Sequence, residues 1–147
     1  MKTANKQKSV YLIGSLANPK IPYFGNELRD LGFTVYDQWW APGPLTDSYW
    51  RQYTKIRGLS YKEALRDCAA THIFEFDVGL IRKSDVVILV MSAGKSAHME
   101  LGYAIGIGKK GYVLFESEPK RYDLMYQFAT DVFFDKSELI KELQKSS

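Results

Sequence analysis

Residues 85–91, Asp-Val-Val-Ile-Leu-Val-Met, form an almost continuous run of apolar, largely β-branched side chains. Such a run is typical of a strand buried on both faces, as in the middle of a parallel sheet, because a half-exposed strand alternates apolar and polar residues. Shorter apolar runs occupy residues 10–13, 33–36, 112–115 and 132–134. We therefore expect five strands in one parallel sheet.

Segments with helical spacing of apolar residues separate these runs. We expect helices over residues 22–31, 61–82, 97–106, 123–129 and 137–144, and an aromatic-rich loop that leads into a short helix over residues 37–53. Ser60 and Glu63 have the spacing of a capping box, and the helix behind them is expected to bury an apolar face. That face is formed by Tyr61, Leu65, Cys68, Ala69, Ile73, Phe76 and Leu80.

The alternation of strands and helices predicts a doubly wound α/β fold with helices on both faces of the sheet. With five strands, we expect the flavodoxin-like order 2-1-3-4-5. The length of 147 residues fits a single domain over residues 1–147, with residues 1–8 expected to be disordered.

The composition excludes several function classes. A net charge of +3, from 20 basic and 17 acidic residues, is too small to predict a nucleic-acid polymer or a membrane surface as partner. Cys68 is the only cysteine and is expected to be a small buried residue, so no disulfide forms within the chain. Two histidines and one cysteine lack the spacing of metal ligands, and we expect no metal and no cofactor. Without a signal-peptide pattern or a long apolar run, we expect a cytoplasmic protein.

The predicted strand order places a topological switch point between the first and third strands, where ligands bind outside the carboxyl ends. Gly14 and Ser15 follow the first strand, and residues 92–102, Ser-Ala-Gly-Lys-Ser-Ala-His-Met-Glu-Leu-Gly, follow the third. A small, glycine- and serine-rich turn before a helix N-terminus suits an anion. A tight turn that needs small residues is the structural alternative, and a P-loop is excluded because its upstream glycine is missing. The candidate ligand-binding residues here are Ser92, Gly94, Lys95, Ser96 and His98.

Glu100 lies in the first turns of that helix. We expect Met99, Leu101 and Ala104 to be buried and the carboxylate of Glu100 to point into the cleft. The helix dipole should keep this carboxylate ionised, as a nucleophile requires. A surface residue that stabilises the helix is the alternative.

Three segments together resemble the nucleoside 2-deoxyribosyltransferase family: residues 10–15, Val-Tyr-Leu-Ile-Gly-Ser; Asp77, eight residues before Asp85; and residues 98–104, His-Met-Glu-Leu-Gly-Tyr-Ala. The resemblance covers about residues 10–116 and is closest to the branch of deoxynucleoside 5′-monophosphate N-glycosidases and related cytidylate hydrolases. It implies a flavodoxin-like fold, a homodimer or larger assembly, a nucleoside or nucleotide substrate, and a retaining mechanism through a covalent ribosyl–enzyme ester.

By this resemblance, Glu100 matches the nucleophile that attacks C1′ of the sugar. Asp77 matches the second carboxylate, which positions the nucleophile or protonates the departing base, and Tyr11 matches the tyrosine that hydrogen-bonds the nucleophile. Gly14 and Ser15 match the loop that touches sugar or phosphate. The chemistry agrees, because a carboxylate stabilises the positive charge that builds at C1′, and a second carboxyl group can donate a proton if burial raises its pKa. A structural hydrogen bond for Asp77 and a core position for Tyr11 are the alternatives.

The chain departs from the family ahead of the glutamate. Nucleoside transferases of the family carry an Asp-x-Gly-Thr element there, where this chain has Gly94-Lys95-Ser96-Ala97-His98. Lysine, serine and histidine suit a 5′-phosphate through charge and hydrogen bonds, which favours a nucleotide substrate and water as acceptor. A solvated Lys95 and a packed His98 are the alternatives.

The aromatic-rich loop offers Trp39, Trp40 and Trp50, on which a nucleobase could stack. Filling the core or a dimer interface is the more common role, and for each tryptophan alone we favour it.

Three function classes follow. The first is hydrolysis of an N-glycosidic bond, the second is base exchange by a deoxyribosyltransferase, and the third is an NAD-splitting or nucleotide-sensing module of the Toll/interleukin-receptor-like type. The joint presence of Tyr11, Asp77 and Glu100 favours the first two.

Overall fold

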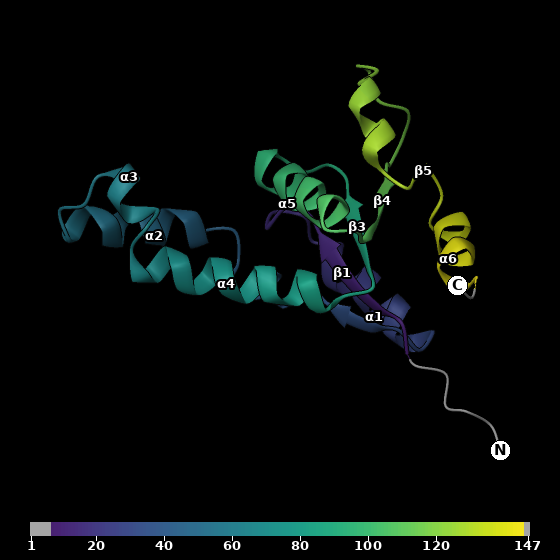
Figure 1. Ribbon diagram of the computed structural model, residues 1–147, viewed down its shortest axis with the longest axis horizontal. Coiled ribbons are helices and arrows are strands. Elements are labelled where there is room, and N and C mark those ends of the chain that lie inside the picture. Colours follow the sequence, from purple (N-terminus) through teal and green to yellow (C-terminus); the bar gives the residue numbers. More distant parts are fainter. Residues whose placement is uncertain (1–6, 146–147) are drawn as a thin grey trace.

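The computed structural model describes residues 7–145 and contains a five-stranded, all-parallel sheet with the order β2-β1-β3-β4-β5 (Figure 1). The strands are β1 (Ser9–Ile13), β2 (Thr34–Tyr36), β3 (Val86–Val90), β4 (Lys110–Leu114) and β5 (Asp131–Phe133). The predicted flavodoxin-like order is confirmed. Of the stretch predicted to be disordered, residues 1–6 lie outside the described residues, and the carbonyl of Lys8 accepts a hydrogen bond from the N–H of Thr34 at 3.1 Å.

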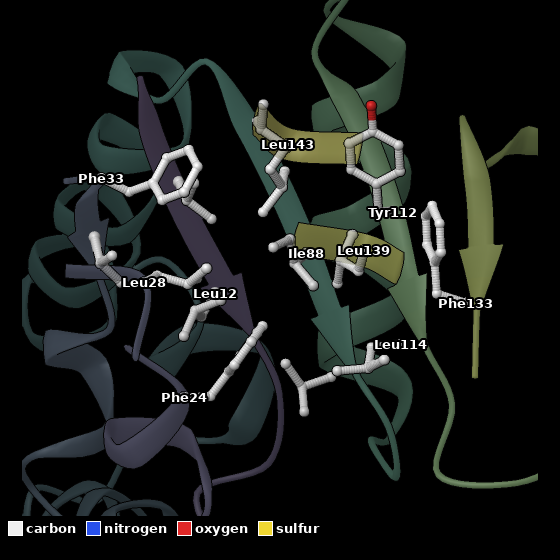
Figure 2. Packing of buried hydrophobic residues seen from close by; sticks show 14 of the residues in the cluster. Leu12, Phe24, Leu28, Phe33, Ile88, Tyr112, Leu114, Phe133, Leu139 and Leu143 are labelled. Carbon is white, nitrogen blue, oxygen red and sulfur yellow. The ribbon is translucent and has the colours of Figure 1, made fainter. Parts of the chain in front are cut away.

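Helices cover both faces of the sheet, as the alternation predicted. They are α1 (Ile21–Asp30), α2 (Thr46–Ile56), α3 (Tyr61–Ala64), α4 (Cys68–Lys83), α5 (Lys95–Gly106) and α6 (Lys136–Gln144), with short 3₁₀ segments η1 (Gln38–Trp40) and η2 (Leu124–Phe128). Side chains of α1 and α6 pack on one face of the sheet (Figure 2), and side chains of α4 and α5 pack on the other.

The two cores explain the continuous apolar runs. In β1, Leu12 points to the face covered by α1 and α6, while Tyr11 and Ile13 point to the opposite face. In β3, Ile88 and Val87 divide between the faces in the same way. Because successive side chains of a strand alternate between faces, a strand with a core on each side needs an apolar residue at every position.

The segment between β2 and β3 differs from the prediction. The helix expected at the end of the aromatic-rich stretch over residues 37–53 is α2, which follows η1 and runs on to Ile56. The helix predicted over residues 61–82 is instead two helices, α3 and α4, separated at residues 65–67. The expected buried face is largely exposed at Tyr61, Leu65, Ile73 and Phe76. Cys68 was predicted to be buried and is exposed. The cause is that α4 meets the sheet only through its second half, where Val78 and Ile81 are buried.

Residues 46–76, which comprise α2, α3 and the first half of α4, are called the arm below. Figure 1 shows the arm extending away from the sheet along the outer part of α4. Within the arm, Trp50 meets Tyr61 edge to face, and Arg57 forms an ion pair with Asp67. Within residues 7–145, no helix combines the length and apolar character needed to cross a bilayer.

A bidentate ion pair joins α1 to the residue that follows β2. The Arg29 guanidinium donates to both carboxylate oxygens of Asp37, at 2.6 and 3.2 Å, and Asp37 is buried. Gly25 lies so close that an added Cβ would come within 2.2 Å of Asp37 Oδ2. This pair fixes the start of η1, which carries Trp39 and Trp40.

Candidate active site

A cleft of about 720 Å³ lies outside the carboxyl ends of β1, β2 and β3, where the strand order predicted a ligand site. One wall comes from the segments that follow these strands, and the other comes from the arm and the middle of α4. The lining residues are Gly14, Ser15, Leu16, Ala17, Gln38, Trp39, Pro42, Pro44, Thr46, Asp47, His72, Ile73, Phe76, Asp77, Gly94, Lys95, Ser96, Ala97 and Glu100.

Glu100 lines the cleft from α5. This helix packs on the sheet through Ala97, Leu101 and Ala104, so Glu100 lies beside the packed face and is itself half-buried. Burial, and then the charge of Asp77, raise the pKa of Glu100 from 4.5 to about 7. The helix dipole was expected to keep this carboxylate ionised, whereas burial brings its pKa up to the neutral range. The expectation of a buried Met99 is wrong, since its side chain is exposed.

Asp77 faces Glu100 from α4. It immediately precedes Val78, which packs toward the sheet, and is half-buried at the edge of the cleft. Burial raises the pKa of the Asp77 carboxyl group, as the sequence predicted. Asp77 and Glu100 line the same cleft, and the charge of Asp77 contributes to the raised pKa of Glu100. A close pair of carboxyl groups in a partly buried site favours a state in which one holds a proton.

Tyr11 lies in the middle of β1, on the sheet face covered by α4 and α5. Its side chain is fully buried, and its hydroxyl has no hydrogen-bond partner among the described residues. Burial, then Glu100, then Asp77, raise the pKa of the Tyr11 hydroxyl well above its usual value, so the hydroxyl remains a donor. An unpartnered buried hydroxyl is uncommon, and a hydrogen bond to the Glu100 carboxylate would provide its missing partner.

The opposite end of the cleft suits an anion. Gly94 precedes α5 without a side-chain cap, so the first N–H groups of the helix are open to a ligand, and Lys95 and Ser96 lie beside them. Gly14 and Ser15 complete this end. An added Cβ on Gly14, directly after β1, would come within 2.9 Å of Ile21 Cδ1, so any larger residue there requires the Ile21 side chain to shift.

Several predicted ligand residues do not reach the cleft. His98 is held by the Gly94 carbonyl at 2.7 Å and by the Tyr126 hydroxyl at 2.8 Å, which is the packed alternative. The Trp40 indole N–H donates to the Asn18 carbonyl at 2.8 Å and its ring packs against the core. Ser92 is exposed outside the cleft lining, and Trp50 stays within the arm.

Trp39 does line the cleft, and its indole N–H donates to the Leu12 carbonyl at 2.7 Å. Sequence reasoning missed His72 and Phe76 of α4, which line the same wall as Asp77. The signal was present: Phe76 lies one helical turn after His72, and both are close to Asp77 in sequence.

A second cavity of about 770 Å³ lies between α5 and η2, on the other side of Gly94 and Lys95. His98 and Tyr126 line it, whereas Glu100 and Asp77 do not. The carboxylate pair therefore belongs to the first cleft. Over residues 7–145, the His, Cys, Asp and Glu side chains form no group of three that could hold a metal ion.

No protein-family model matches the sequence, and no curated protein is significantly similar to it. What the chain shares with known proteins is thus established at the level of architecture: an α/β fold whose five parallel strands follow the flavodoxin-like order 2-1-3-4-5.

Proposed function

We propose that this chain is an N-glycosidase that cleaves the bond between base and sugar in a nucleoside 5′-monophosphate or nucleoside, with Glu100 as nucleophile and water as acceptor. The observation that carries the proposal is the pair of carboxyl groups of Glu100 and Asp77 in one cleft, together with the buried, unpartnered Tyr11 hydroxyl, whose pKa both carboxyl groups raise. The same three residues lie in the segments that carry the resemblance to the nucleoside 2-deoxyribosyltransferase family.

In the first step, the Glu100 carboxylate attacks C1′ and forms an ester. The bond between C1′ and the base nitrogen breaks, its electron pair leaves with the base, and a proton from the Asp77 carboxyl group neutralises the departing base. In the second step, water attacks C1′ and the Asp77 carboxylate accepts a proton from that water. The products are free base and sugar or sugar 5-phosphate, and Glu100 is again a carboxylate.

The charges of the site support this division of roles. Burial raises the pKa of both carboxyl groups, and the charge of Asp77 raises the pKa of Glu100 further, so the pair holds a proton more readily than two free carboxyl groups would. One group can then attack while the other donates a proton. A hydrogen bond from Tyr11 to Glu100 would favour the ionised form of Glu100 and so leave the proton on Asp77.

The rest of the cleft suits the remaining parts of the substrate. A 5′-phosphate would accept hydrogen bonds from the N-terminal N–H groups of α5 and from Lys95 and Ser96. The base would lie toward Trp39, which follows β2, and Phe76 on α4, because both aromatic side chains line the cleft. Stacking of one base on an aromatic side chain typically contributes about 1–3 kcal/mol.

Chromatography of free base tests the proposal. The protein is incubated with a panel of nucleosides and 5′-monophosphates, each with and without a second acceptor base. We expect base release from at least one monophosphate without an acceptor, and none from Glu100→Ala, whose fold is checked by circular dichroism. Exchange only when an acceptor base is added would replace hydrolysis by transfer. Release of nicotinamide from NAD with silence across the panel would refute the proposed substrate class.

A further inference from the structure

The second cavity, between α5 and η2, has a volume of about 770 Å³ and lies apart from the carboxylate pair. Sites for small organic ligands typically measure about 300–1,000 Å³. Glu100, Asp77 and Tyr11 do not line this cavity, which shares only Gly94 and Lys95 with the first cleft. The proposed reaction makes no use of it, and the kind of molecule that would fit follows from its lining.

One face of α5 forms a long wall of this cavity. The lining residues of α5 recur at helical spacing from its first residue, Lys95, to its last, Gly106, and therefore share one face. At about 1.5 Å per residue, this face extends over roughly 16 Å. The space above the helix is open at Gly102 and Gly106, since an added Cβ on either would meet no neighbouring atom within 4 Å. The cavity thus offers room for an elongated molecule.

Apolar side chains form most of the rest of the lining. Leu101 and Ile105 come from α5, and Met125, Phe128 and Ala129 come from η2 and the residue after it. Met125 and Phe128 are exposed rather than packed in the core. Apolar walls offer water few hydrogen bonds, and covering them with an apolar molecule is favourable. The body of a fitting ligand is therefore apolar.

Two cationic side chains line the same cavity. Within residues 7–145, Lys95 and Arg121 form no ion pair and donate no side-chain hydrogen bond. Asp123, the acidic residue of the lining, accepts a hydrogen bond from the Met125 N–H at 2.9 Å and so caps η2. An anionic group on a ligand would give both cations a partner, through charge-assisted hydrogen bonds.

We propose that the second cavity binds an organic anion with an extended apolar body, of the fatty-acid or alkyl-phosphate type. The apolar body would lie along α5, over Gly102 and Gly106 and against the apolar side chains of η2. The carboxylate or phosphate would accept hydrogen bonds from Lys95 and Arg121. This site stands on the cavity and its lining, and it does not depend on the proposed N-glycosidase activity.

Isothermal titration calorimetry with decanoate, kept below its micelle concentration, tests the site, and 1-decanol serves as the neutral analogue. We expect decanoate to bind and 1-decanol to bind about 10- to 100-fold more weakly, because it lacks the charge-assisted hydrogen bonds. Arg121→Gln should weaken decanoate binding about 10-fold and leave the affinity for 1-decanol unchanged. Decyl phosphate, titrated in the same way, distinguishes a phosphate from a carboxylate as the preferred anionic group.

A second variant tests where the apolar body lies. Gly102→Leu occupies the open space above α5 and should abolish binding of both decanoate and 1-decanol. Gly79→Leu is the matched control, because Gly79 is also helical, leaves an added Cβ without a neighbouring atom within 4 Å, and lies outside both linings. It should bind decanoate as the wild type does. Circular dichroism checks that each variant is folded.

Three results would overturn the proposal: no binding of decanoate, equal affinity for decanoate and 1-decanol, or undiminished binding to folded Gly102→Leu. Glu100→Ala should bind decanoate like the wild type, and a clear loss of affinity would assign the anion to the first cleft instead. A protein that binds decanoate as expected but releases no base from any substrate would refute the proposed function and leave the second site standing.

Discussion

Replacing Glu100 with Gln is expected to stabilise the fold above neutral pH while abolishing turnover. Burial and the Asp77 charge raise the pKa of Glu100 from 4.5 to about 7 in the folded state. Between these values the unfolded chain loses its proton while the folded chain keeps it. The folded state then binds more protons than the unfolded state, so the free energy of unfolding decreases as pH rises from about 4.5 to 7.

The size of this effect follows from the pKa difference. Each pKa unit corresponds to about 1.4 kcal/mol, so the ionised Glu100 destabilises the fold by about 3 kcal/mol. Glutamine has nearly the same shape and no charge, and it removes this cost. We expect Glu100→Gln to raise the free energy of unfolding by up to about 3 kcal/mol near pH 8, and by almost nothing near pH 4. The corresponding rise in Tm near pH 8 is roughly 6–12 °C.

Urea unfolding at both pH values, followed by circular dichroism, measures the difference. Glu75→Gln is a matched control, because Glu75 is an exposed glutamate on α4. Its stability should follow that of the wild type at both pH values. If Glu100→Gln and Glu75→Gln are equally stable near pH 8, Glu100 is not a buried carboxyl group and the electrostatic account of the site fails.

Three further substitutions test parts of the account. Asp77→Asn removes the charge that helps to raise the pKa of Glu100. In the pH–rate profile, kcat should fall strongly with KM little changed, and the acidic limb should move to lower pH. An acidic limb that does not move would contradict the electrostatic pairing of the two residues. Tyr11→Phe removes a buried, unpartnered hydroxyl. Urea unfolding should show no loss in the free energy of unfolding, and a gain of up to roughly 1 kcal/mol, while kcat falls. A clear loss of stability would instead show that the Tyr11 hydroxyl has a structural role. Gly25→Ala should displace the buried ion pair of α1 and cost roughly 3 kcal/mol in thermal unfolding. Its control, Gly79→Ala, meets no atom within 4 Å and should be neutral or slightly stabilising; equal effects would argue against the close packing at Gly25.

The sheet could be predicted because its signal is local. Each strand is a short apolar run, and the run at residues 86–90 is continuous because Ile88 and Val87 face different cores. Strand order follows from the alternation with helices, and the position of the cleft follows from the strand order. Gly14 and Glu100, far apart in the sequence, were thus predicted to lie at one site, and both line the cleft.

The arm could not be predicted in the same way. Helical periodicity identifies an apolar face but does not say what covers it. Tyr61 and Phe76 follow the spacing of a buried face, yet both are exposed in the protomer. Where the helix breaks is also non-local, because Asp67 before α4 pairs with Arg57 at the end of α2.

The sequence also does not predict which side chains from distant segments become partners. The ring of His98 is held by Tyr126, 28 residues away, which nothing in the glycine- and serine-rich turn indicates. The ionisation of Glu100 depends on how deeply the cleft buries it, and burial raises its pKa to about 7, which the helix position alone does not indicate. Local patterns predict which chemistry is present, whereas burial decides its protonation state.

Trapping of the covalent intermediate tests the central claim most directly. A substrate analogue with fluorine at C2′ destabilises positive charge at C1′ and slows hydrolysis of the ester, so the adduct can accumulate and be located by mass spectrometry of peptides. The account predicts one sugar, or sugar phosphate, on the peptide that contains Glu100, and none in Glu100→Ala. An adduct on another residue, or base release by Glu100→Ala at the wild-type rate, would contradict it.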